Sequence, residues 1–180
     1  MEDFNLDDFE IEDITPKKKK RKVDGGRKGK SGERELCKIL SKRFGSEFTR
    51  TIGSGNRWSQ VSNMPSHAKN TFTGDICCPE GFLFSIECKN GYEDKIDLGT
   101  IISNQNKTLD DFLKQAIKES KDCERKPLVC WKRKYKPWVS FVQLKNLNNN
   151  NFKSYLIYKD WICVDLEKLL SLPDNFFFEI

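Results

Sequence analysis

Residues 82–89 read FLFSIECK, and this short run decides how the rest of the chain is interpreted. Its apolar residues predict a buried β-strand, with Glu87 and Lys89 at the strand's end. Side chains two positions apart on a strand project from the same face. We therefore expect a carboxylate and an ammonium group to lie side by side at the end of an apolar element.

A second apolar run, GDICC at residues 74–78, lies just upstream and begins with Gly-Asp75. Residues 79–81, Pro-Glu-Gly, have the composition of a tight turn. A hairpin closed by that turn would bring Asp75 close to Glu87 and Lys89. Two carboxylates and a lysine can hold a divalent cation and position a water molecule, which is the chemistry of phosphodiester hydrolysis. The alternative is a simple salt bridge among the three at the strand end.

The charge distribution favours a polyanionic partner. The formal net charge over 180 residues is +5, but residues 1–14 carry seven acidic and no basic side chains. The remainder is therefore about +12, which favours nucleic acid as a partner over a merely soluble basic protein. Seven cysteines without zinc-type spacing predict neither a zinc site nor a disulfide framework. No apolar run is long enough for a membrane span, and nothing resembles a signal peptide.

The N-terminal segment divides into an acidic and a basic part. Residues 1–15 alternate acidic and apolar side chains, which suits a disordered tail, a motif docking on replication or recombination proteins, or a DNA mimic. Residues 16–22, PKKKKRK, suit a DNA-contacting arm or a nuclear localisation signal. We expect a cytoplasmic protein of a prokaryotic or phage-infected cell, or a nuclear one in a eukaryotic host. The expected divisions are a flexible arm (1–27), a core (28–145) and a C-terminal strand and helix extension (146–180).

The first predicted helix covers residues 32–44, with Ser31 as its N-cap and Gly45 as its stop. Its apolar residues form one stripe at helical spacing. Glu33 falls within that stripe, whereas Glu35 falls on the solvent side. An inward carboxylate needs a partner, and a metal site is one. The helix dipole is the alternative explanation for an acid in the first turn.

A short strand is predicted at residues 48–52, followed by a long polar stretch at 53–73. Basic, aromatic and small polar residues in that stretch suit contacts with phosphates and unstacked bases. Its lone histidine, His67, is more readily a phosphate contact than a catalytic group. Further predictions are a helix over 108–121 that carries Gln115, strands over 127–132, 138–144 and 155–164, and a helix over 166–172. The sequence also predicts a basic segment at 132–137, a linker at 148–151, and three phenylalanines at 176–178 that are buried against a partner subunit.

Several motifs together resemble a known family. Residues 28–36, KGKSGEREL, are similar to the opening motif of archaeal-type Holliday junction resolvases, and Arg50 followed by Gly53-Ser54-Gly55 resembles their next element. GDI at 74–76 and IECK at 86–89 resemble the catalytic signature of the PD-(D/E)XK nucleases. The resemblance covers residues 28–144. It departs from compact resolvases in an insertion between residues 55 and 73, as in virus-encoded members.

The resemblance implies an α/β protein of the restriction-endonuclease-like fold, with a central mixed β-sheet flanked by helices. The implied catalytic residues are Glu33, Arg50, Asp75, Glu87 and Lys89. Mg²⁺, or Mn²⁺, would be held by Asp75, Glu87, Glu33 and the main-chain carbonyl of Cys88. DNA would be contacted by Lys28, Lys30, Arg50, Ser54, Arg57, Trp58, His67, Lys69 and Gln115.

The expected function is metal-dependent endonuclease cleavage of branched DNA. A homodimer is expected because resolving a four-way junction needs two symmetric nicks. We expect its interface to use the apolar hairpin and later strands, together with residues 176–178. Three alternatives stay open: another endonuclease of the superfamily (restriction-like or nicking), a non-catalytic nucleic-acid-binding module, and a protein that docks through residues 1–15.

Overall fold

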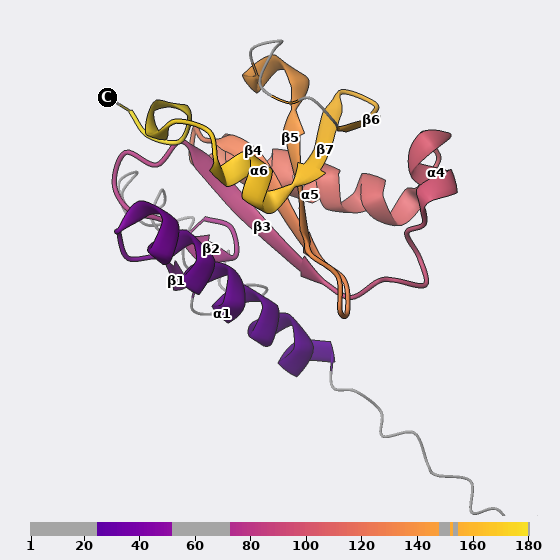
Figure 1. The fold of residues 1–180 in the computed structure, drawn as a ribbon, viewed down its shortest axis with the longest axis horizontal. Coiled ribbons are helices and arrows are strands. Elements are labelled where there is room, and N and C mark those ends of the chain that lie inside the picture. Colours follow the sequence, from indigo (N-terminus) through magenta and orange to yellow (C-terminus); the bar gives the residue numbers. More distant parts are fainter. Residues whose placement is uncertain (1–24, 52–72, 148–151, 153–154, 180) are drawn as a thin grey trace, which may run out of the picture.

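A computed structural model describes residues 25–51, 73–147, 152 and 155–179. Figure 1 shows a central sheet covered by helices. The sheet has the order β3 (Phe84–Asn90), β4 (Lys126–Lys132), β5 (Trp138–Gln143), β7 (Trp161–Asp165), β6 (Leu156–Tyr158). The β3–β4 pair is parallel and the other pairs are antiparallel, so the expected mixed sheet is confirmed.

Helices cover both faces of this sheet. On one face lie α1 (Gly25–Phe44) and α6 (Leu166–Leu170), and on the other lie α4 (Leu98–Ile102) and α5 (Lys107–Asp122). Two short 3₁₀ helices span Leu144–Asn146 and Asp174–Phe176. Because side chains alternate along a strand, Phe84, Ile86 and Cys88 of β3 pack toward α1, whereas Lys89 meets α5. Among the described residues, no helix is long and apolar enough to cross a membrane.

Helix α1 begins earlier than expected. It starts at Gly25, so Ser31 lies inside the helix and is not its N-cap, which corrects our prediction. The extra turns are held by the end of β3, where the Asn90 side chain donates a hydrogen bond to the carbonyl of Lys28 at 2.9 Å. A Cβ at Gly32 would lie 2.8 Å from the Asn90 amide nitrogen. Glycine at this position therefore allows the helix to approach the strand.

The other end of α1 and its phase are as predicted. Gly45 follows the helix with φ +65°, and its N–H donates to the carbonyl of Ser41 at 3.0 Å. Glu33 is buried on the inner side, whereas Glu35 is exposed. The apolar stripe therefore fixed the direction of both carboxylates.

The predicted hairpin before β3 forms only in part. Its turn is present, since the N–H of Phe82 donates to the carbonyl of Pro79 at 3.3 Å and Gly81 has φ +74°. However, β2 (Ile76–Cys77) pairs as a strand with β1 (Thr49–Arg50). The predicted strand at residues 48–52 is thus shorter, and within it residue 52 lies outside the described residues. This segment is joined to β3 by a main-chain hydrogen bond from the N–H of Asp75 to the carbonyl of Ile86 at 2.9 Å, and by the Asp75 side chain, which accepts from the N–H of Cys88.

Most later elements agree with the sequence-based predictions. Strands β4 and β5 and helices α5 and α6 lie where expected to within about two residues. Helix α4 was not expected. The single strand predicted at 155–164 is instead two antiparallel strands, β6 and β7. They are separated by a turn at Lys159, which has φ +53°.

The phenylalanines at 176–178 pack inside their own chain, which corrects the expectation that they meet a partner subunit. Phe177 is fully buried, its ring centroid lies 4.9 Å from that of Phe44, and its ring is parallel to that of Phe82 to within 12°. The Leu83 N–H donates to the Phe177 carbonyl at 2.7 Å. The apolar hairpin is buried in the same cluster. Neither segment is therefore available as the dimer interface that we expected.

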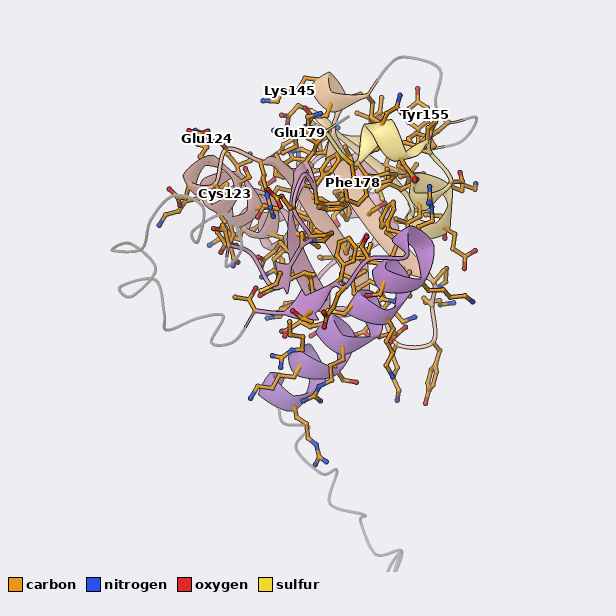
Figure 2. The ribbon with its side chains drawn as sticks, turned by 90° about the vertical axis from the view of Figure 1, so that its left-hand side faces the viewer. Cys123, Glu124, Lys145, Tyr155, Phe178 and Glu179 are labelled. Atoms are coloured by element: carbon orange, nitrogen blue, oxygen red, sulfur yellow. The ribbon has the colours of Figure 1, made fainter. Side chains whose placement is uncertain are left out.

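The segment after residue 145 belongs to the central sheet. It contains strands and a helix as predicted, but β7 lies inside the sheet, between β5 and β6. Large exposed apolar side chains gather near this region: Leu98 and Ile102 on α4, and Tyr155, Leu156 and Ile157 on or next to β6. Figure 2 shows Tyr155 at the far end of the molecule from the first turns of α1.

Candidate active site

Asp75 is fixed against the edge of β3 by main-chain and side-chain hydrogen bonds. Its N–H donates to the carbonyl of Ile86, and its Oδ2 accepts from the N–H of Cys88 at 2.9 Å. Its own carbonyl accepts from the N–H of Thr51 at 3.0 Å. These bonds to the two neighbours of Glu87 place Asp75 beside that residue, as the sequence predicted.

The close approach of Asp75 to β3 depends on the preceding glycine. Gly74 has φ +81°, a conformation that L side chains rarely adopt. A Cβ at this position would lie 2.8 Å from the carbonyl oxygen of Ile86. Any larger residue would therefore push the aspartate away from the strand.

Glu87 and Lys89 form an ion pair on the face that meets α5, in which Glu87 is buried and Lys89 partly buried. The Lys89 Nζ lies 2.5 Å from Glu87 Oε1 and donates to the side-chain oxygen of Gln115 at 2.9 Å. Only 2% of Glu87 is exposed, and its Oε2 is buried without a hydrogen-bond partner among the described residues. A buried carboxylate oxygen without a partner is unfavourable. Within the described part of the chain, no cation and no hydrogen-bond donor contacts Glu87 Oε2.

The carboxylates of this cluster hold their protons more tightly than usual. Burial, reinforced by the negative charge of Asp75, raises the pKa of Glu87 to about 9. Burial also raises the pKa of Asp75 to about 6, against the effect of the Cys88 N–H and with a contribution from Glu33. Burial lowers the pKa of Lys89, but attraction to Glu87 outweighs it and the net shift is upward. Raised pKa values are expected where two buried carboxylates lie close together and too little positive charge is nearby to stabilise both ionised forms.

Glu33 and Arg50 add a second ion pair to the site. The Arg50 Nε donates to Glu33 Oε2, and Glu33 is only 8% exposed. Its negative charge contributes to the raised pKa of Asp75, so it acts on the same cluster. In this arrangement Glu33 is partnered by an arginine from β1.

Glu35, two residues further along α1, lies on the opposite side of the helix. Its Oε1 accepts from the indole N–H of Trp138 at 2.9 Å and lies 3.1 Å from the Lys132 Nζ. About half of its side chain is exposed. Glu35 therefore joins α1 to the β4–β5 hairpin and takes no part in the carboxylate cluster.

The acidic residues fit a magnesium site that uses few protein ligands. Among the described residues, no three His, Cys, Asp or Glu side chains are grouped so as to hold a metal ion. Magnesium prefers hard oxygen ligands and keeps several of its waters, so two carboxylates and a main-chain carbonyl suffice. The unpartnered Oε2 of Glu87 and the adjacent Asp75 carboxylate match that donor set.

The remaining predicted DNA contacts fall into two groups. Lys28 and Lys30 lie on the first turns of α1, beside the end of β3; Lys28 is 3.7 Å from Glu93 and Lys30 is exposed. Gln115 lies on α5 and accepts its hydrogen bond from Lys89. The others lie outside the described residues: Ser54, Arg57, Trp58, His67 and Lys69.

One residue of the site was missed by the sequence analysis. Glu119 accepts a hydrogen bond from the Gln115 amide at 3.0 Å, and its charge raises the pKa values of Asp75 and Glu87. It lies four residues after Gln115 on α5, so the two share a helix face. That spacing was the signal that would have found it.

A mixed sheet in which one strand carries Glu87 and Lys89, with Asp75 held beside it, is the arrangement of a nuclease of the PD-(D/E)XK class. Residues 24–174 match the family model described as phage putative PDDEXK endonuclease. The chain belongs to this family, and the sheet described above is its restriction-endonuclease-like core. No curated protein matches the chain. Among solved structures, it is similar to Archaeoglobus fulgidus Hjc, a Holliday junction resolvase, with 19% identity and a TM-score of 0.39 over 78% of this chain and 90% of that chain.

Proposed function

We propose that this nuclease is a magnesium-dependent enzyme that cleaves branched DNA, with four-way junctions as its substrate. The observation that carries the proposal is the meeting of Asp75, Glu87 and Lys89 on and beside β3, with Glu87 Oε2 buried and without a partner among the described residues. The choice of branched DNA is supported by the order of motifs from Glu33 to Lys89, which is similar to that of the archaeal-type resolvases. A net charge of about +12 over residues 15–180 suits a polyanionic substrate.

Each residue of the site has a role that follows from its position. Asp75, Glu87 and the main-chain carbonyl of Cys88 would hold Mg²⁺, or Mn²⁺ in its place. When bound, the cation lowers the pKa of a water ligand and neutralises charge on the phosphate. Lys89, oriented by Glu87 and Gln115, donates to the attacking water or to a phosphate oxygen.

The pair of Glu33 and Arg50 binds the substrate phosphate in this scheme. The planar guanidinium of Arg50 has five N–H donors, of which Nε is used by Glu33. The remaining donors suit a phosphate oxygen. Glu33 then holds the arginine in place, which is a different role from the metal ligation that we first expected.

The DNA path extends from the active site to the N-terminal part of the chain. Lys28 and Lys30 lie on α1 next to the end of β3 and contact the phosphate backbone. The basic run at residues 16–22 and the polar stretch with Arg57, Trp58, His67 and Lys69 supply further contacts. Two copies of the protein act on one junction, because resolution requires nicks on two opposed strands.

The test is cleavage of matched substrates by the full chain in the presence of Mg²⁺. A labelled four-way junction, a linear duplex with the same arms and a single strand are compared, and light scattering measures the oligomeric state. We expect symmetric pairs of nicks on the junction, little cleavage of linear duplex, and a dimer. A monomer that cuts linear duplex as fast as the junction would replace this proposal with a general endonuclease of the same family. Failure to cut any DNA would reject it entirely.

A further inference from the structure

The connection between β4 and β5 carries an aromatic side chain that the active site does not use. Residues 133–137 read RKYKP, and Tyr135 is 89% exposed. Among the large apolar and aromatic side chains that the structure describes, the next most exposed is Ile102 at 63%. Packing therefore gives no reason for a tyrosine at this position.

The backbone gives no reason for a tyrosine either. The N–H of Lys136 donates to the carbonyl of Arg133 at 3.2 Å and closes a tight turn. Within it, Tyr135 has φ +58°, a conformation that glycine and asparagine adopt readily and bulky residues rarely adopt. A residue that is unfavourable for the turn and unburied is best explained by what its ring contacts outside the chain.

The hairpin formed by β4, residues 133–137 and β5 is held in place against the segment that follows β3. The Gly91 N–H donates to the carbonyl of Lys132 at 2.8 Å, and the Trp131 indole donates to the carbonyl of Gly91 at 2.7 Å. The N–H of Lys134 donates to Glu93 Oε1 at 2.6 Å. These bonds give the exposed ring a defined position relative to the end of β3.

Positive charge surrounds the exposed ring. The Lys134 Nζ lies 4.8 Å from the centre of the Tyr135 ring, and Lys134 and Lys136 are both exposed. Within the described part of the chain, neither lysine forms an ion pair. An aromatic ring between uncompensated cations suits a nucleobase and its neighbouring phosphates. The same charges would repel a second copy of the hairpin.

The hairpin lies beside the catalytic end of β3. In the parallel register of β3 and β4, Lys89 is opposite Trp131 and Asn90 is opposite Lys132. Figure 1 shows the β4–β5 connection just beyond the arrowhead of β3. Tyr135 lies in the turn three residues beyond Lys132, so its ring is presented past the end of β3 that carries Lys89.

We infer that residues 133–136 form a DNA-contacting hairpin, in which Tyr135 stacks on an unstacked base of the DNA that leads away from the active site. Lys134 and Lys136 contact the backbone phosphates on either side of that base. This inference rests on the proposed DNA cleavage and adds a basis for substrate choice. Taking a base out of the stack costs less where pairing or stacking is already weakened, as at a branch point, than inside an intact duplex.

The test compares Tyr135→Asn with Tyr135→Trp in the full chain. Asparagine removes the ring and tolerates the backbone conformation, while tryptophan keeps a stacking surface. Junctions carrying 2-aminopurine at each of the first six nucleotides from the cut report stacking through fluorescence. We expect Tyr135→Asn to weaken junction binding about tenfold or more and to lose the fluorescence change, with Tyr135→Trp retaining both. Binding to linear duplex stays within about twofold in each variant.

Tyr155→Asn is the matched control, because Tyr155 is also exposed but lies at the other end of the sheet, next to β6. It should leave junction binding and fluorescence unchanged. A Tyr135→Asn protein that binds, cleaves and responds as the wild type does would overturn the inference. So would dissociation of a dimer by this substitution in light scattering, since the hairpin would then be a subunit contact.

A second variant keeps the inference testable if Tyr135→Asn is poorly folded. Replacing both Lys134 and Lys136 by alanine should reduce the slope of log affinity against log salt by about two, and an unchanged slope would count against the hairpin contact. The wild-type reactions separate this result from the proposed function. If the wild type cleaves no DNA with Mg²⁺, the proposed function fails; if it cleaves but the hairpin variants match it, only the present inference fails.

Discussion

The apolar end of β3 and its charged end, which runs from Glu87 at the middle of the strand to Asn90, are chemically opposite. At the start of the strand, the fully buried Phe84 lies among the rings of Phe82, Phe176 and Phe177. In the charged end, Glu87 is 2% exposed, and its Oε2 has no partner among the described residues. Burying rings stabilises the fold, whereas burying a carboxylate oxygen without a partner destabilises it. The comparison indicates that the apolar end supplies the stability that the charged end needs for its chemistry.

The largest expected effect is at the charged end. Asp75→Asn removes a negative charge from the cluster but keeps the side-chain shape and the approach of Gly74 to β3. Cleavage of a junction should fall by at least about a thousandfold, because stabilisation of the transition state is removed. Junction affinity, measured by fluorescence anisotropy, should change little, because it depends mainly on basic residues. Near-normal cleavage would show that the site has been misassigned.

The complementary change at the apolar end should alter stability without altering chemistry. Phe177→Ala removes a fully buried ring and should lower the free energy of unfolding by about 3–5 kcal/mol in urea denaturation. Cleavage per folded molecule, measured well below the melting temperature, should remain near that of the wild type. A decrease in activity larger than the decrease in folded protein would mean that the two ends of β3 are not separable.

A smaller contrast lies on α1, where Glu33 and Glu35 face in opposite directions. Glu33→Gln weakens the hold on Arg50 and should slow cleavage by about 10- to 100-fold. Glu35→Gln alters only half-exposed contacts with Trp138 and Lys132 and should change the rate by less than about twofold. Both are measured by single-turnover cleavage of the same junction. Equal effects from the two substitutions would contradict the assigned roles.

The smallest expected effect concerns the N-terminal arm. Deleting residues 1–24 removes the six basic side chains of residues 17–22 and leaves α1 intact from Gly25. The slope of log affinity against log salt should become shallower by roughly 0.9 for each phosphate that the arm neutralises in the wild type. The catalytic rate on saturated junction should not change. An unchanged slope would assign the basic run to a role other than DNA binding.

The active-site elements could be predicted because side chains repeat every two residues along a strand and about every 3.6 residues along a helix. Alternation along β3 placed Glu87 and Lys89 together, and helical spacing directed Glu33 inward and Glu35 outward. Asp75 was placed correctly because a Pro-Glu-Gly turn leaves few other paths for the chain. These features depend on the spacing of residues that are close together in the chain, which can be read from a single sequence.

The errors arose where tertiary contacts override local preference. The first turns of α1 contain three glycines, which disfavour a helix, yet Asn90 and the packing of Gly32 stabilise them. The turn between β6 and β7 uses Lys159 with φ +53°, which no turn preference indicates. The burial of Phe177 follows from a contact with Phe82, 95 positions earlier in the chain. None of these contacts is visible in the pattern of neighbouring residues.

The most direct test of the account is single-turnover cleavage of a four-way junction by the wild type and by Glu87→Gln, with Mg²⁺ and with EDTA. Glutamine keeps the shape of the side chain and removes the charge of the carboxylate whose Oε2 has no partner among the described residues. The account predicts Mg²⁺-dependent cleavage by the wild type, none in EDTA, and a rate at least about a thousandfold lower for Glu87→Gln. Cleavage that persists in EDTA, or a Glu87→Gln protein as active as the wild type, would contradict it.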